Sequence, residues 1–130
     1  MKTEARTYLI TGGTYLVSCS GALVDATARR VARRLERLVD GDAREIVLEL
    51  RDIVAIDLTM LRQLVAVGRK ASSAGTVATV ACEDEGVARL LRLLGAEPEL
   101  ELAPTVPDAF AQVARRARGA RPPAAWPVPG

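Results

Sequence analysis

The stretch that decides the fold is residues 46–71, which reads IVLELRDIVAIDLTMLRQLVAVGRKA. Its first five residues, 46–50, are short, branched and largely apolar, as is typical of a central strand. Residues 51–56 continue this strand less regularly. Over residues 58–71 the apolar positions change to helical spacing, so the sequence predicts a strand that runs directly into a helix.

Asp57 lies at the junction between this strand and this helix. Its carboxylate can accept the free backbone N–H of Thr59 or Met60, so we expect Asp57 to be the N-cap. Successive side chains of a helix are rotated by about 100° around its axis. If Leu61 faces the core, Thr59 points nearly opposite to it, toward solvent. The inward side also carries Leu64, Val65, Gly68 and Ala71; the outward side also carries Arg62, Gln63, Ala66 and Lys70.

Upstream of this junction the sequence predicts a β-hairpin. Two strand-like runs, residues 7–10 and 15–19, flank Gly12 and Gly13. Both glycines can adopt the positive φ that primed hairpin turns require. We expect Gly21 to end the second strand.

A helix is then expected from Asp25, as its N-cap, up to Gly41, because apolar residues recur at helical spacing between them. Five arginines fall mostly on the side opposite these apolar residues: Arg29, Arg30, Arg33, Arg34 and Arg37. We interpret this side as a solvated face, with a partner-docking face as the alternative.

The rest of the chain continues the alternation of strands and helices. We expect a strand over 76–81, a helix over 84–94 stopped by Gly95, a short edge strand over 100–102, and a helix through Arg118 that a capping box at 105–108 opens. In the third helix the expected inward residues are Val87, Leu90, Leu91 and Leu94.

This order predicts an α/β fold. We expect a mixed, mostly parallel sheet with an N-terminal antiparallel hairpin edge and about four helices packed against it. Residues 1–118 form the expected domain, and the Pro- and Ala-rich residues 119–130, with Trp126, form an expected flexible tail.

Composition removes several kinds of chemistry. The 130 residues contain no His, and Lys+Arg 18 against Asp+Glu 16 gives a net charge of only +2. Cys19 and Cys82 lie far apart and outside any CxxC motif, so we interpret both as free core residues. No signal peptide or membrane span is apparent. We therefore expect a cytoplasmic protein without metal or cofactor, and without nucleic acid or membrane as its partner.

The sequence offers two other candidate sites, one for phosphorylation of an aspartate and one for nucleic-acid binding. A receiver-type phosphoacceptor would use Asp52 and Asp57, but glycines stand where it needs an acidic pair after the first strand, and Lys70 lies mid-helix. Nucleic-acid binding would depend on the first helix and a cluster of Arg115, Arg116, Arg118 and Arg121, without groove-reading or aromatic motifs.

Three motifs, in order, resemble those of the STAS domains, the family that includes bacterial anti-sigma-factor antagonists. Residues 21–25, GALVD, are similar to the family's Gly-Glu-Leu-Asp, and residues 56–61, IDLTML, to its Asp-Ser-Ser/Thr-Gly-Leu. The third motif is the turn at Gly75 with the strand and Leu-rich helix that follow. The resemblance covers roughly residues 6–118.

The resemblance implies partner switching in the regulation of transcription. Antagonists of this family bind a serine/threonine kinase that is also an anti-sigma factor, and so release the sigma factor. The kinase phosphorylates the hydroxyl directly after the motif's Asp, and a phosphatase resets the cycle. Here that position is Leu58, so we expect phosphorylation to be altered or lost, with Thr59 as the candidate acceptor. Met60 replaces the motif's Gly, and Val24 the first motif's Asp.

We therefore expect a non-enzymatic interaction module that docks a kinase-type anti-sigma factor. Its expected binding residues are Asp25, Asp57, Leu58, Thr59, Met60, Arg62 and Gln63. Exposed Leu58 and Met60 would supply apolar contact, and Arg62 and Asp25 complementary charge. The alternative is a STAS subunit of a bacterial lipid-transport ATPase, in which a Thr in this motif region is common. The oligomeric state stays open, with a homodimer among the options.

Overall fold

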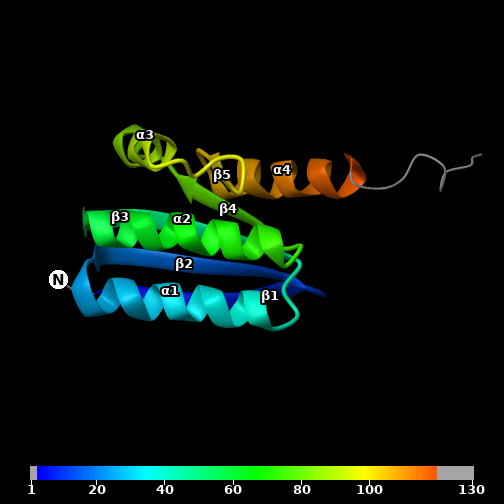
Figure 1. Cartoon of the computed structure of the whole chain (residues 1–130), viewed down its shortest axis with the longest axis horizontal. Helices are drawn as coiled ribbons and strands as arrows, with labels where there is room; N and C mark the ends of the chain where they lie inside the picture. Colours follow the sequence, from blue (N-terminus) through cyan, green and yellow to red (C-terminus); the bar gives the residue numbers. More distant parts are fainter. Residues whose placement is uncertain (1–2, 120–130) are drawn as a thin grey trace, which may run out of the picture.

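The computed structural model describes residues 3–119 (Figure 1). Side chains are described up to residue 116. Its strands are β1 (Glu4–Thr11), β2 (Thr14–Leu23), β3 (Glu45–Ile56), β4 (Val77–Cys82) and β5 (Leu100–Ala103). Its helices are α1 (Asp25–Asp40), α2 (Leu58–Ser73), α3 (Glu85–Leu93) and α4 (Val106–Gly119). Of the expected tail, residues 120–130 with Trp126 lie outside the described residues.

The strands form one five-stranded sheet in the order β1-β2-β3-β4-β5. The β1–β2 pair is antiparallel, and every other pair is parallel. The predicted α/β fold, a mostly parallel sheet with an antiparallel hairpin edge and four helices, is confirmed.

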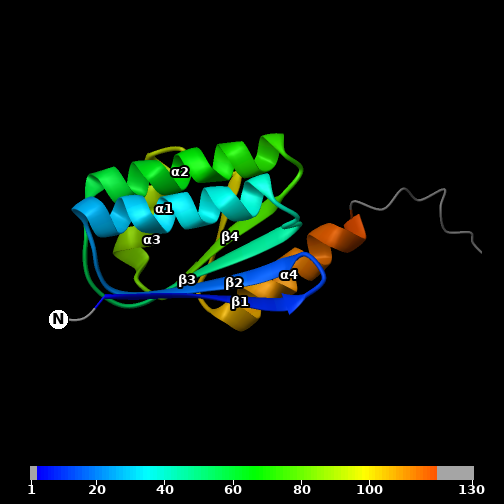
Figure 2. The same ribbon diagram turned by 90° about the horizontal axis from the view of Figure 1, so that it is seen from below.

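The helices form layers on both faces of the sheet. Helices α1 and α2 lie side by side over one face, with α3 next to α2, and α4 lies on the opposite face (Figure 2). Alternate residues of β3 therefore enter different cores. Ile46 and Leu48 pack in the larger core under α1 and α2, and Val47 packs with Ala109 and Val113 of α4 in the smaller one. This burial on both faces explains why residues 46–50 are almost continuously apolar.

Helix α2 is buried on two sides because it packs against both the sheet and α1. The predicted inward residues are all buried: Leu61, Leu64, Val65, Gly68 and Ala71. Gly68 allows a close approach to β5, since a Cβ at this position would lie 2.7 Å from the Cβ of Leu100.

The hairpin is confirmed, but the two expectations about its glycines need correction. Only Gly13 of the pair has positive φ, at 86°. Gly21 does not end β2, which continues to Leu23. Instead Gly21, with φ 92°, lies at an irregularity of the β2–β3 ladder, and Asp52 in β3 also has positive φ, at 49°. The strands thus continue past this β-bulge, which a local breaker rule does not foresee.

Two side chains of the helices lie differently from expectation. Leu90 was expected to face inward, but it is 46% exposed, because the short α3 buries only Val87 and Leu91. Arg34 was expected on a solvated face, but it is half-buried, and its Nη1 donates a hydrogen bond of 2.6 Å to the carbonyl oxygen of Ala5.

The stop of α3 and the N-cap of α4 agree with expectation. Gly95, with φ 82°, follows the end of α3. Thr105 caps α4, since its Oγ1 accepts the Asp108 N–H at 3.2 Å. The expected capping box is only half formed, because the Asp108 carboxylate accepts the Thr105 hydroxyl at 2.9 Å rather than the Thr105 backbone N–H. Cys19 and Cys82 are buried and free. Within residues 3–119, no helix is long and apolar enough to cross a membrane.

Candidate docking site at the start of helix α2

The candidate site lies where β2 and β3 end and α1 and α2 begin. Because β2 and β3 are parallel, their carboxyl ends reach the same edge of the sheet, and both helices start there (Figures 1 and 2). Sites in α/β proteins commonly form at this edge.

Asp57 joins the two helix starts. Its Oδ1 accepts the Met60 N–H at 2.8 Å, which confirms the predicted N-cap of α2. Its Oδ2 accepts the Asp25 N–H at 3.3 Å, at the first residue of α1. One carboxylate therefore satisfies unpaired N–H groups of two helices and fixes their amino ends relative to each other.

The predicted N-cap role of Asp25 is wrong. Val24 occupies the N-cap position, with extended backbone and without a side-chain cap, and Asp25 is the first residue of α1. Asp25 has a φ of 52°, a left-handed conformation that is costly for most residues but better tolerated by Asp. Its carboxylate is exposed, so Asp25 presents a negative charge beside the start of α2.

Leu58 and Thr59 lie in the exposed first turn of α2. We use the name α2 tip for the surface formed by Asp57, Leu58, Thr59, Arg62 and Gln63. Thr59 is exposed, as predicted, and Leu58 is 49% exposed. The positive end of the helix dipole lies in this turn, which favours negative charge. A phosphate on Thr59 would therefore be tolerated by the helix, but it would also repel the carboxylate of Asp57 nearby.

Met60 was expected to be exposed and to contact the partner directly, and this is wrong. Its side chain is 0% exposed and belongs to the larger core. Met60, Leu64, Val67 and Ala71 follow one another at helical spacing and are all buried. These residues belong to the larger core, on a helix that packs against both the sheet and α1, so Met60 supports the α2 tip from the core.

The other predicted residues of the tip differ in exposure. Arg62 is exposed, whereas Gln63 is half-buried. The Oε1 of Gln63 is buried without a hydrogen-bond partner within the described part of the chain. Sequence reasoning missed Val54, which is 58% exposed near the end of β3. The exposure of Val54 could not be predicted, because an apolar residue in an apolar stretch is expected to be buried in the sheet.

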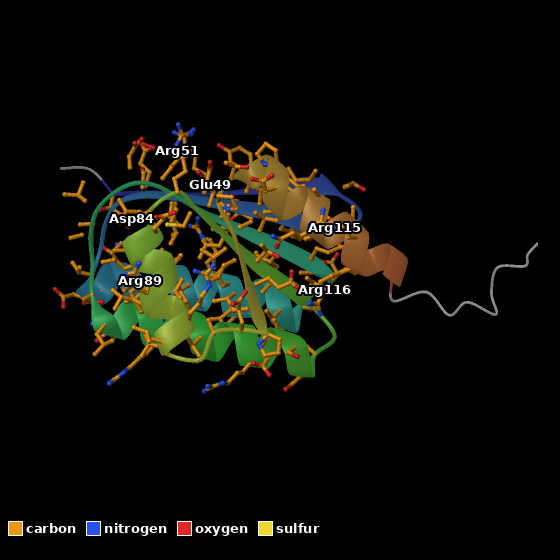
Figure 3. All side chains as sticks on the ribbon, turned by 90° about the horizontal axis from the view of Figure 1, so that it is seen from above. Glu49, Arg51, Asp84, Arg89, Arg115 and Arg116 are labelled. Carbon is orange, nitrogen blue, oxygen red and sulfur yellow. The ribbon has the colours of Figure 1, made fainter. Side chains whose placement is uncertain are left out.

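A hollow of about 510 Å³ lies at the carboxyl ends of β3, β4 and β5. Glu49 and Arg51 of β3 and Asp84 at the start of α3 lie along it (Figure 3). Asp84 is occupied as the N-cap of α3, since its Oδ1 accepts the N–H groups of Gly86 and Val87. Among the described residues, no cluster of acidic or Cys side chains could hold a metal ion.

The structure adds no support for the receiver-type phosphoacceptor or for nucleic-acid binding. Asp52 is highly exposed beside this hollow, while both oxygens of Asp57 accept backbone N–H groups, so the two do not form a receiver-type acidic pocket. In the basic cluster, Arg116 of α4 forms an ion pair with Glu101 (Figure 3). Arg121 lies outside the described residues, as does the side chain of Arg118.

The thiol of Cys19 is chemically quiet. Burial raises its pKa to about 12, and the charges of Arg34 and Glu49 act on it in opposite directions. Burial also raises the pKa of the Cys82 thiol. Since the thiolate is the reactive form, neither cysteine is suited to nucleophilic catalysis at neutral pH.

Comparison with known proteins identifies the family and agrees with the fold. The model of the STAS domain family matches residues 6–109. No curated protein matches the chain. Among solved structures, an anti-sigma factor antagonist from Mycobacterium paratuberculosis has a TM-score of 0.74 at 21% identity, covering 87% of this chain and 95% of that one.

Two structures of the anti-sigma factor antagonist SpoIIAA share the fold as well. Its unphosphorylated form has a TM-score of 0.69 at 10% identity, covering 89% of this chain and 99% of that one. The phosphorylated form, from Bacillus, has a TM-score of 0.65 at 13% identity, covering 85% and 99%. The resemblance inferred from residues 21–25 and 56–61 is thereby confirmed: the chain belongs to the STAS domain family.

Proposed function

We propose that this chain is an anti-sigma-factor antagonist that acts by binding, without catalysis, to an anti-sigma factor of the serine/threonine-kinase type. The observation that carries the proposal is the α2 tip, where the exposed Thr59 and Leu58 follow an Asp57 that is hydrogen-bonded to the starts of both α1 and α2. The structures of SpoIIAA, a protein solved in unphosphorylated and phosphorylated forms, support it by fold.

The proposed contacts divide into apolar and charged groups. Leu58 at the tip and Val54 near the end of β3 offer exposed apolar side chains. Asp25 and Arg62 place opposite charges at its margins. Complementary charges of this kind steer encounter and select partners more than they add affinity. Asp57 and Met60 act as positioning residues, one through backbone hydrogen bonds and the other from the core.

Thr59 is the proposed phosphoacceptor. The position directly after Asp57 is Leu58, which has no hydroxyl, so the kinase would have to transfer its phosphoryl group to the next residue. A phosphate adds about −1.5 to −2 charges. Placed in the first turn of α2, it would repel Asp57 and any acidic group of the partner, and so weaken the complex.

Calorimetry with a purified kinase-type anti-sigma factor from the same cell tests the proposal. We expect saturable binding to the unmodified chain and at least about ten-fold weaker binding to Thr59→Glu. Ser73→Glu is the matched control, because it adds the same charge to the exposed far end of α2, about 21 Å away at 1.5 Å per residue. We expect this control to bind within about two-fold of the unmodified chain.

Mass spectrometry after incubation with the kinase and Mg-ATP tests the acceptor separately. Phosphate on Thr59, absent from Thr59→Ala, is the expected result. Binding without phosphorylation would retain the antagonist function and remove the switch. Binding to the nucleotide-binding subunit of a lipid transporter, and to none of the kinases, would contradict the proposal.

A further inference from the structure

A second hollow, of about 370 Å³, lies between β1 and α1, and nothing in the proposed docking depends on it. Its polar lining comes from the amino end of β1 and from the first turns of α1: Thr3, Glu4, Arg6, Thr27, Arg30 and Arg34. The volume lies at the lower end of the range for small-molecule pockets, about 300–1,000 Å³. We call it the β1–α1 hollow.

The charge of this hollow is positive. Arg30 and Arg34 of α1 line it, and among the described residues neither guanidinium group has a carboxylate within 4.0 Å. Glu4 and Arg6 also border it, but Ala5 between them packs against the core under α1, so their side chains leave β1 toward the opposite face of the sheet. Arg6 Nη2 there lies 3.7 Å from Glu4 Oε2, and both side chains are well exposed, so this ion pair is weak.

Of the two arginines, Arg34 is the more firmly held, and Arg30 is exposed with one bond within its own helix. Arg34 is half-buried, and its Nη1 donates to the carbonyl oxygen of Ala5 at 2.6 Å. Arg30 Nη2 donates to Thr27 Oγ1 at 3.3 Å. The guanidinium group has five donors in a planar fork, so each arginine keeps further N–H groups for a ligand. A fork that is already oriented loses less freedom when it binds an oxyanion.

The ligand that suits this lining is a compact, multiply charged anion. Arg30 and Arg34 lie one turn apart on α1 and supply both positive charge and N–H donors. The amino end of α1 adds little to this field, since the carboxylates of Asp25 and Asp57 already lie there.

We propose that the β1–α1 hollow binds a phosphate group, either as the free ion or at the end of a small organic phosphate. Arg30 and Arg34 hold the phosphate oxygens, and the Thr27 hydroxyl completes the set. Arginine matches phosphate because its parallel N–H groups can bind two oxygens at once. The hollow exceeds the size of one phosphate ion, so it leaves room for the organic part of a monoester.

Isothermal titration calorimetry of the full chain, with inorganic phosphate and with ribose 5-phosphate at constant ionic strength, tests this site. Arg30→Gln should weaken both ligands about ten-fold or more, because it removes a charge-assisted contact. Arg33→Gln is the matched control, since Arg33 is exposed on the same helix and does not line the hollow. It should change affinity less than about two-fold.

A thermal melt of Arg30→Gln followed by circular dichroism separates loss of the site from misfolding. Arg30 is exposed, so its replacement should leave the melting temperature unchanged while phosphate binding weakens. Tighter binding of ribose 5-phosphate than of inorganic phosphate would assign a monoester, and equal binding would assign the free ion. No saturable binding of either probe, or equal weakening by Arg33→Gln and Arg30→Gln, would overturn the proposal. Neither result depends on the kinase, so the proposed function is tested separately.

Discussion

Replacing Asp57 by alanine removes a carboxylate that accepts hydrogen bonds from the backbone N–H groups of two different helices. The bond from the Met60 N–H to Oδ1, at 2.8 Å, is an N-cap interaction, and loss of such a cap costs about 1 kcal/mol of the free energy of unfolding. The bond from the Asp25 N–H to Oδ2, at 3.3 Å, is longer and exposed, so we assign it about 0.5 kcal/mol. Asp57→Ala should therefore destabilise the chain by about 1.5 kcal/mol.

Asparagine separates the two contributions. It caps helices about as well as aspartate, so its carbonyl oxygen can keep the bond to Met60. Its amide nitrogen is a donor and cannot accept the Asp25 N–H. Asp57→Asn should therefore cost only about 0.5 kcal/mol, the worth of the bond between α1 and α2.

Urea unfolding followed by circular dichroism measures both variants. Asp84→Ala is the matched control, because Asp84 caps α3 through two bonds that stay within that helix. It should cost about 1 kcal/mol and leave binding at the α2 tip unchanged. Equal costs for Asp57→Ala and Asp57→Asn, or a cost below about 0.3 kcal/mol for Asp57→Ala, would refute the bridging role.

Three further predictions concern the core. Met60→Ala should cost about 2–5 kcal/mol in urea unfolding because its side chain is fully buried, and a cost below about 1 kcal/mol would contradict that burial. Gly68→Ala should cost about 1–3 kcal/mol, since its Cβ would lie 2.7 Å from the Cβ of Leu100, and an unchanged unfolding midpoint would argue against this contact. Above about pH 9 the unfolded chain loses the Cys19 proton, while the folded chain keeps it up to about pH 12, so stability relative to Cys19→Ala should fall across that window. A stability difference that stays constant with pH would contradict the burial of this thiol.

Much of the fold could be predicted because its signals are local. The N-cap bond of Asp57 spans three residues, and the N-cap bond of Thr105 to the Asp108 N–H likewise involves neighbours in sequence. The change from strand to helical spacing at residues 56–58 also needs no distant contact. These features are determined by short stretches of chain.

Three of the errors concern contacts between segments that are distant in sequence. Met60 is buried although it lies about 100° from the inward direction of Leu61, because α2 packs against both the sheet and α1. The backbone of Asp25 is fixed by Asp57, which lies 32 residues away. Gly21 continues its strand because β3 follows it through the bulge. Periodicity within one element cannot report such neighbours.

The most direct test of the docking surface is amide hydrogen exchange of the chain alone and in complex with its kinase-type anti-sigma factor. The N–H groups of Leu58 and Thr59 lie in the first turn of α2 and have no intrahelical acceptor, so they should exchange quickly in the free chain. The account predicts strong slowing at residues 58–63 and at the start of α1, with α4 unchanged. Slowing confined to α4, with residues 58–63 unaffected, would contradict it.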